Sequence, residues 1–176
     1  MKKCTFISFL LSLTITCGST SCARQTTTQT HTIKDNGITI TWIQDNATPK
    51  TMPASLFSQE AQAVIDSLGM KESGIPSTIS SFLVQVGGKN ILFDTGLGLP
   101  DSLLKALQSL QISPDNIQYI FLTHFHGDHI GGLLTNKGET VFKQAQIYAA
   151  RAEYEGWMKM PQNQRTQIEK TVSAYG

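Results

Sequence analysis

Apolar and polar residues alternate from Ile38 to Ile43, in a segment rich in β-branched side chains. This pattern predicts a half-buried β-strand and places the start of the folded region near Gly37. Farther along the chain, apolar residues recur at helical spacing between Leu56 and Leu68, and Gly69 is placed to end the helix. The first expected elements are therefore a strand and an amphipathic helix.

The middle of the chain predicts a hairpin, a second helix and an interior strand. Residues 81–86 and 91–93 flank a short glycine-containing loop, which is typical of a β-hairpin, whereas residues 74–77 are expected to form a loop. Leucines between Leu103 and Leu110 predict another amphipathic helix. The apolar run 117–122 is typical of a strand covered on both faces of a sheet. This order predicts an α/β fold.

The N-terminus has the layout of a secretory signal peptide over residues 1–22: a basic start, an apolar stretch over residues 4–15, then small residues. The segment Thr20-Ser21-Cys22-Ala23 looks like the cleavage site of a bacterial lipoprotein, so Cys22 is expected to carry lipid. Cys17 is the weaker candidate, and ordinary signal cleavage is the alternative. We expect an exported protein, lipid-anchored in the bacterial cell envelope (periplasmic or outer-membrane) or otherwise secreted, with no other membrane contact.

Residues 23–36 are mostly polar, rich in threonine and glutamine, and without apolar periodicity. Such a segment buries too little surface to offset its ordering entropy, so we expect a tether in which His31 is solvated. The folded part is expected over residues 37–176.

Charge and cysteine content restrict the possible binding partners and metal ligands. The 176 residues contain 14 Lys and Arg and 13 Asp and Glu, a formal net charge of +1, which disfavours a general nucleic-acid binder. The three cysteines are Cys4, Cys17 and Cys22, so all of them lie in the expected signal segment. A metal site in the folded part must therefore use histidine and carboxylate.

Three of the four histidines lie together, with an aspartate, in the segment after the apolar run 117–122. His124 and His126 are two apart on an extended segment, so both side chains can point to one side. Asp128 and His129 are then free to face a second point. Imidazole and carboxylate suit zinc, and four ligands on one loop can serve two ions about 3.5–4 Å apart. Gly131-Gly132 would let a helix begin close to the metal.

The motif His-x-His-x-Asp-His-x-Gly-Gly, preceded by Phe93-Asp94-Thr95-Gly96, resembles the metallo-β-lactamase fold superfamily. Residues 146–154 resemble the branch with quorum-quenching lactonases and methyl parathion hydrolase. The resemblance implies an αβ/βα sandwich and two zinc ions, the first bound by His124 and His126 and the second by Asp128 and His129. It also implies that Asp94 steadies the ligand loop without touching metal, although an Asx turn is the alternative for this residue.

No histidine follows His129, whereas the family supplies three further ligands beyond the motif. We therefore expect residues 37–176 to form the N-terminal part of the domain, about the first half of the sandwich. A fragment of a longer protein is favoured over a truncated gene, because a half-sheet would expose an apolar face and an open edge. The isolated chain is expected to be metal-poor and inactive.

For the complete protein, the resemblance implies a zinc-dependent hydrolase that uses a metal-bridged hydroxide on a small lactone, ester, phosphoester or β-lactam. Asp128 would orient the nucleophile and pass a proton to the leaving group. The alternatives are a degenerate non-catalytic lipoprotein, an iron-binding oxidoreductase of the same fold and, more weakly, a nuclease. Tyr154, Trp157 and Met158 are expected to pack as helix residues, with the lining of a substrate entrance as the alternative, and Glu153 and Glu155 are expected to be solvated.

Overall fold

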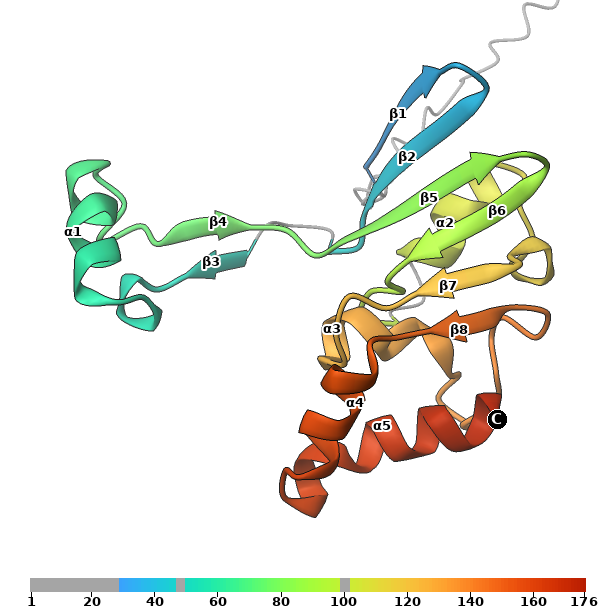
Figure 1. Cartoon of the computed structure of the whole chain (residues 1–176). Helices are drawn as coiled ribbons and strands as arrows, with labels where there is room; N and C mark the ends of the chain where they lie inside the picture. The colour runs from blue at the N-terminus through green and yellow to red at the C-terminus, as the bar shows by residue number, and fades with distance from the viewer. Residues whose placement is uncertain (1–28, 47–49, 99–101) are drawn as a thin grey trace, which may run out of the picture.

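The computed structural model describes residues 29–46, 50–98 and 102–176. Its main sheet has six strands in the order β1-β2-β5-β6-β7-β8 (Figure 1). The neighbours β1, β2, β5 and β6 pair antiparallel, whereas β6, β7 and β8 pair parallel. This mixed sheet with its helices confirms the predicted α/β class. The strands span Thr30–Asp35 (β1), Ile38–Gln44 (β2), Ser80–Val86 (β5), Lys89–Phe93 (β6), Tyr119–Phe121 (β7) and Gln146–Tyr148 (β8).

The expectation of a tether over residues 23–36 is wrong for its last part, because Thr30–Asp35 form β1. All six of its side chains are exposed, so the strand is held by pairing with β2 rather than by burial. Asn36 and Gly37 connect the two strands with φ of 43° and 79°, and Asn-Gly is the dipeptide that favours such a turn. The expected signal peptide and Cys22 lie outside the described residues.

A two-stranded ribbon projects from the main sheet as an arm (Figure 1). It pairs β3 (Lys50–Met52) with β4 (Ile75–Ser77), so the loop expected over residues 74–77 is in fact a strand. Between them lie η1 (Ala54–Leu56) and α1 (Gln59–Ser67), which confirm the first predicted helix. Gly69 ends this helix with φ of 71°, as its position predicts.

The remaining helices and the core lie on one face of the sheet. The helices are α2 (Leu103–Ser109), η2 (Pro114–Asn116), α3 (Gly127–Ile130), η3 (Gly131–Leu133), α4 (Arg151–Met158) and α5 (Gln162–Tyr175). Strand residues such as Leu83, Leu92 and Ile120 form one buried cluster with helix residues such as Leu107 and Ile168. Within the described parts of the chain, none of the helices has the length and apolar character needed to cross a membrane.

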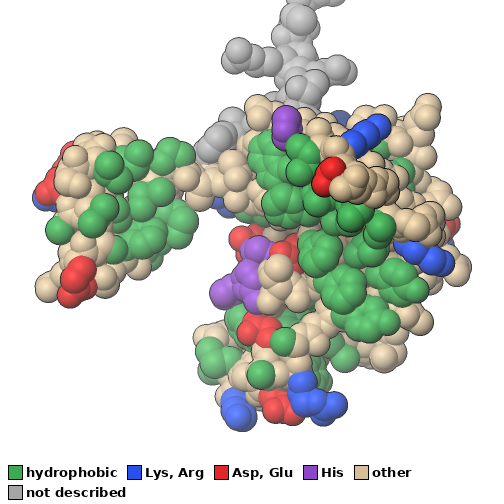
Figure 2. All heavy atoms as spheres, turned by 45° about the horizontal axis from the view of Figure 1, so that its top comes forward, with side chains coloured by type: hydrophobic (Ala, Val, Ile, Leu, Met, Phe, Trp, Pro, Cys, Tyr) green, Lys and Arg blue, Asp and Glu red, His purple; other side chains and the backbone are tan. Residues whose placement is uncertain are grey.

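The opposite face of the sheet carries an exposed row of aromatic side chains, which we call the aromatic face: Phe82, Phe93, Phe121 and Tyr148. The ring centroids of Phe93 and Phe121 are 5.4 Å apart, and those of Phe121 and Tyr148 are 5.0 Å apart. Figure 2 shows hydrophobic side chains gathered over this face beside the histidines. The interior strand β7 is therefore covered on one face only, not on both. One sheet with one helical layer is the arrangement expected for the first half of an αβ/βα sandwich.

Candidate metal centre

The candidate site forms where three parallel strands end side by side. Asp94 follows β6, Thr123 and the histidine segment come shortly after β7, and α4 begins shortly after β8. Parallel strands present their carboxyl ends at the same edge of a sheet, so residues far apart in sequence meet there. The short helix α3 then carries Asp128 and His129 beside this edge.

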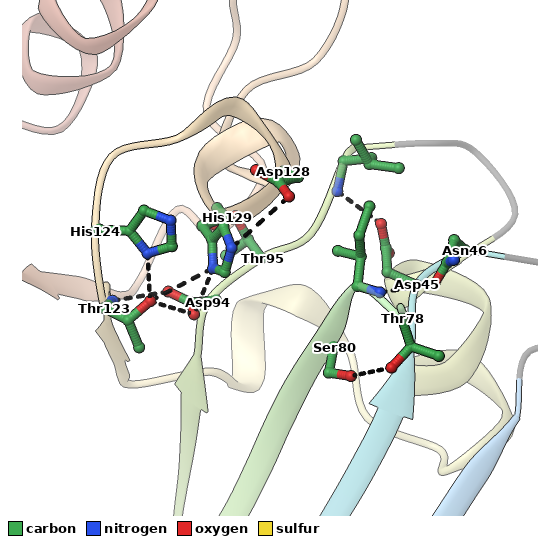
Figure 3. Close-up of polar contacts among 12 residues, drawn as sticks. Asp45, Asn46, Thr78, Ser80, Asp94, Thr95, Thr123, His124, Asp128 and His129 are labelled. Atoms are coloured by element: carbon green, nitrogen blue, oxygen red, sulfur yellow. Dashed lines mark hydrogen bonds and ion pairs between the residues drawn. The ribbon is translucent and has the colours of Figure 1, made fainter. Parts of the chain in front are cut away.

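Asp94 joins the loop after β6 to the histidine segment (Figure 3). Its Oδ1 accepts a hydrogen bond from the backbone N–H of Thr123 at 2.8 Å, and its Oδ2 accepts one from the Thr123 hydroxyl at 2.7 Å. The same Oδ2 lies 2.8 Å from Nδ1 of His129. These partners are 29 and 35 residues away along the chain, so the contacts of the carboxylate are long-range, as the expected positioning role requires, and not those of a local Asx turn.

The three imidazoles form one cluster. The ring centroids of His124 and His129 are 3.8 Å apart, and those of His124 and His126 are 4.7 Å apart. Nε2 of His129 lies 3.8 Å from Oδ2 of Asp128. All four residues that the sequence singles out as ligands are therefore brought together at the end of β7 and on α3.

Thr123, which the sequence analysis overlooked, orders the Nδ1 proton of His124, and Asp94 does the same for His129. Because the Asp94 carboxylate only accepts, the single hydroxyl proton of Thr123 goes to it, and the hydroxyl oxygen accepts from Nδ1 of His124 at 2.9 Å. His129 likewise donates from Nδ1 to Asp94. In the neutral rings, this arrangement leaves the lone pair on Nε2 of His124 and of His129, which is the form in which imidazole binds a metal ion.

The donor set fits a borderline divalent cation such as zinc, because it offers neutral imidazoles and a carboxylate. Among the described side chains, no three from His, Cys, Asp and Glu already stand in the arrangement of a complete metal site.

The surroundings of His124 favour its neutral form. Burial lowers the pKa of His124 below its usual 6.5, and the neighbouring His129 and His126 lower it further. The carboxylates of Asp94 and Glu153 oppose this effect. A neutral imidazole near pH 7 is the form that a metal ligand needs.

Two glycines let α3 and η3 lie directly against the loop after β6. A Cβ on Gly131 would be 2.5 Å from the carbonyl carbon of Leu97, and one on Gly132 would be 2.3 Å from the carbonyl oxygen of Thr95. Thr95 is fully buried, and its N–H and hydroxyl both donate to the carbonyl of His129, at 2.7 and 3.0 Å. The glycine pair thus serves close packing against this loop, in addition to starting the 3-10 helix η3.

Glu153 is not simply solvated, contrary to expectation. Its Oε1 accepts hydrogen bonds from the backbone N–H of Phe125 at 3.2 Å and from Nε1 of Trp157 at 2.7 Å, and the first of these contacts is the main reason why its pKa is lowered. The Trp157 ring in turn meets His126 edge-on at 5.2 Å. The i,i+4 spacing of Glu153 and Trp157 on a helix was the available signal. Glu155 is exposed, as expected.

The remaining aromatic and sulfur side chains of α4 behave as predicted. Tyr154, Trp157 and Met158 are partly buried and pack against the hydrophobic core. This packing fixes α4 beside the histidine segment, so Glu153 contacts Phe125 from a supported position.

Comparison with solved structures shows the same fold. The chain superposes on AidC, described as a dizinc quorum-quenching lactonase, with a TM-score of 0.66 and 24% identity over 84% of this chain and 58% of that one. The hydrolase AbOPH of the beta lactamase superfamily gives a TM-score of 0.63 and 24% identity over 83% of this chain and 55% of that one. The chain thus spans just over half the length of these proteins.

Curated relatives match over a shorter stretch. The lactamase-like protein nscB of Aspergillus fumigatus is 46% identical over 54 residues, which is 31% of this chain and 16% of that protein. Ribonuclease Z of Pyrococcus horikoshii is 44% identical over 55 residues, which is 31% of this chain and 17% of the enzyme.

The match at the level of the family is broader. The sequence pattern of the Metallo-beta-lactamase superfamily fits residues 74–174, from the end of the arm through α5. This range contains the strands β6 to β8 and the whole histidine cluster. The chain belongs to the metallo-beta-lactamase superfamily, as the histidine motif led us to expect.

Proposed function

We propose that the full-length protein is a zinc-dependent hydrolase that holds two zinc ions, or other divalent ions, in the histidine cluster. The observation that carries this proposal is the contact of Asp94 with both Thr123 and His129 beside three clustered imidazoles. A buried carboxylate that orients a histidine through Nδ1 is the usual support of a histidine that binds metal through Nε2.

Each residue of the cluster has a task in this proposal. His124 and His126 would hold one cation, and Asp128 and His129 the other. Bound divalent cations supply Lewis acidity and make water a nucleophile near neutral pH. Oδ2 of Asp128 would orient that nucleophile and carry a proton to the leaving group, which is general acid–base work. Asp94 and Thr123 would keep the ring protons of His129 and His124 on Nδ1.

The substrate class that we propose is a small molecule with an electrophilic carbonyl or phosphorus: a lactone, an ester, a phosphoester or a β-lactam. The structural likeness to a quorum-quenching lactonase supports this class. The net charge of +1 does not favour a polyanionic substrate. Export and a lipid anchor at Cys22 remain part of the proposal for the whole protein.

The test compares zinc content and hydrolysis in the full-length protein and its variants. We expect about two zinc ions per chain by elemental analysis and turnover of at least one substrate from a panel of lactones, esters, phosphoesters and β-lactams. Replacing His124 and His126 together by alanine should abolish both. The matched control is His31→Ala, because His31 lies on the exposed strand β1. Unchanged zinc content and turnover in the double variant would refute the proposal, and a folded protein with neither would support the degenerate lipoprotein.

A ribonuclease is the second candidate, because several curated relatives are ribonuclease Z enzymes. The same experiment separates the two if a structured RNA is added to the panel. Cleavage of that RNA without turnover of any small substrate would favour the second candidate.

A further inference from the structure

We propose that Asp45 is a positioning residue for the histidine cluster, acting through the loop Asp94–Gly98. The inference rests on the proposed function, because it assigns a residue that holds the metal-binding side chains in place. Asp45 follows β2, is 49 residues away from Asp94 along the chain, and belongs to no motif that the sequence analysis singled out.

Asp45 is a buried carboxylate with two backbone partners on a different part of the chain. The residue as a whole is 3% exposed. Oδ2 accepts a hydrogen bond from the N–H of Leu97 at 2.6 Å, and Oδ1 accepts one from the N–H of Leu103 at 3.2 Å. Asp45 itself is held from behind, because its N–H donates to the carbonyl of Ile79 at 2.8 Å. The carboxylate therefore ties the loop after β6 and the first residue of α2 to the end of β2.

The loop that Asp45 holds is in direct contact with a proposed ligand. Thr95, two residues before Leu97, donates from its N–H and from its hydroxyl to the carbonyl of His129. Asp94, one residue earlier, contacts the ring of the same histidine at Nδ1. Both the backbone and the side chain of His129 are thus positioned by the segment that Asp45 anchors.

The glycines of this loop show that the fit is close on both sides. A Cβ on Gly96 would lie 2.3 Å from Cγ of Asp45, and Gly96 has φ of 67°. On the other side, a Cβ on Gly98 would lie 2.2 Å from the carbonyl oxygen of Gly131. The loop is held between the Asp45 carboxylate and the glycine pair after α3, so a shift at one side displaces the other.

Only a carboxylate satisfies this position. Two backbone donors approach two different oxygens of Asp45, and an amide has one acceptor oxygen and one donor group in their place. The substitution Asp45→Asn keeps the shape but leaves one buried N–H facing another donor. We expect the loop to shift, and the contact between Asp94 and His129 to loosen with it.

The experiment uses the 176-residue chain and measures three quantities. In the metal-free chain, NMR records the exchange rate of the Thr95 and Leu97 amide protons and the ring nitrogen signals of His129. Cobalt absorption titration, extended to millimolar Co²⁺, then records the apparent dissociation constant. For Asp45→Asn we expect faster amide exchange, shifted His129 signals and Co²⁺ binding weakened on the order of threefold to tenfold. This loss is smaller than the 10–100-fold typical of a residue bonded directly to a ligand.

A second variant perturbs the contact between Asp45 and the loop Asp94–Gly98 by changing the loop. Gly96→Ala places a methyl group against the Asp45 carboxylate and should move the same three quantities in the same direction. Gly138→Ala is its matched control, because Gly138 has a similar φ of 81° and nothing lies within 4 Å of an added Cβ. Asp66→Asn, at an exposed ion pair on α1, is the control for the loss of a carboxylate.

The outcomes separate this inference from the proposed function. If Asp45→Asn lowers only the melting temperature while the His129 signals and the Co²⁺ dissociation constant stay unchanged, Asp45 is merely structural and the inference is wrong. If the unaltered chain and the full-length protein bind no Co²⁺, the proposed function fails. In that case the His129 ring signals of the metal-free chain still test whether Asp45 positions His129: a shift in Asp45→Asn supports the inference, and unchanged signals contradict it.

Discussion

Oδ2 of Asp94 lies 2.8 Å from Nδ1 of His129, and the backbone of Asp94 adopts a φ of 59° to make this contact. A left-handed φ is uncommon outside glycine, and Asp and Asn are among the residues that tolerate it best. The Asp94 side chain is 7% exposed, so its three hydrogen bonds form away from bulk water. Asp94 thus turns out of the sheet at the end of β6 and faces the histidine segment.

Replacing Asp94 by asparagine tests this contact. Asparagine keeps the left-handed backbone but puts an amide donor where the carboxylate accepts from Thr123 and His129. We expect a loss of about 1–3 kcal/mol in the free energy of unfolding, since a buried donor is left unpaired. In the full-length protein, zinc affinity should fall by about 10–100-fold, measured with a competing chelator. Asp66→Asn is the control, and equal affinities for both variants would contradict this role.

Replacing Glu153 by alanine tests how α4 is fastened to the histidine segment. The change removes the acceptor of Phe125 N–H and of Trp157 Nε1, and bonds to a charged acceptor contribute about 1.5–3 kcal/mol each before solvent exposure reduces them. We expect a loss of about 1–2 kcal/mol in urea unfolding. Glu155→Ala, two residues away and exposed, should stay within about 0.5 kcal/mol of the unaltered chain. Equal losses in both variants would mean that the Glu153 contacts add no stability.

The pH dependence of unfolding tests the environment of His124. Its pKa in the folded chain is lowered from 6.5, chiefly by burial, so the unfolded chain binds the proton more readily. The contribution of His124 to the free energy of unfolding should therefore be fully present above pH 6.5. It should decline as the pH falls below that value and level off once the pH is below the pKa of His124 in the folded chain. Glu153 acts in a separate window below pH 4.5, because its pKa is lowered from that value.

The measurement for His124 is the urea midpoint at several pH values between 7.5 and 5. His124→Gln should flatten the decline, whereas His31→Gln should leave it parallel to that of the unaltered chain. A decline of the same slope in His124→Gln would assign the proton uptake to another group.

Replacing Phe93 and Phe121 together by serine tests the aromatic face. Both rings are more than a third exposed and stack on each other, so the 176-residue chain is expected to associate through this face at high concentration. The double variant should weaken association about tenfold or more, given about 1.5–3 kcal/mol for each ring fully buried. Sedimentation velocity provides the measurement. Leu56→Ser, at an exposed position on the arm, is the control and should change nothing.

The sequence predicts an element well where burial shapes the pattern. In β5 and β6 the core residues Leu83 and Leu92 alternate with outward side chains, and the hairpin is found where it was expected. In β1 every side chain is exposed, so no alternation marks the strand. Its available signal was the Asn36-Gly37 turn that follows it. The strand over residues 75–77 was missed because its pairing partner lies some 25 residues earlier.

The candidate site also combines residues that local sequence spacing reveals with residues that it does not reveal. Local spacing brings out the histidine cluster, because its members lie within six residues of one another. Asp45 and Leu97 are 52 residues apart, and Phe125 and Glu153 are 28 apart, so no local pattern reports these contacts. They arise only when the sheet has assembled and the helices have packed on it.

The base of the arm has a consequence for how the protein can vary. Asn46 accepts from the N–H of Ile79 at 2.8 Å, and the carbonyl of Ile79 accepts from Asp45 at the same distance, so the chain leaves and rejoins the sheet at one point. The arm contributes no strand to the main sheet, so shortening, lengthening or exchanging it would leave the strand order of that sheet unchanged. The arm can therefore change in length or sequence without altering the strands to which it is attached.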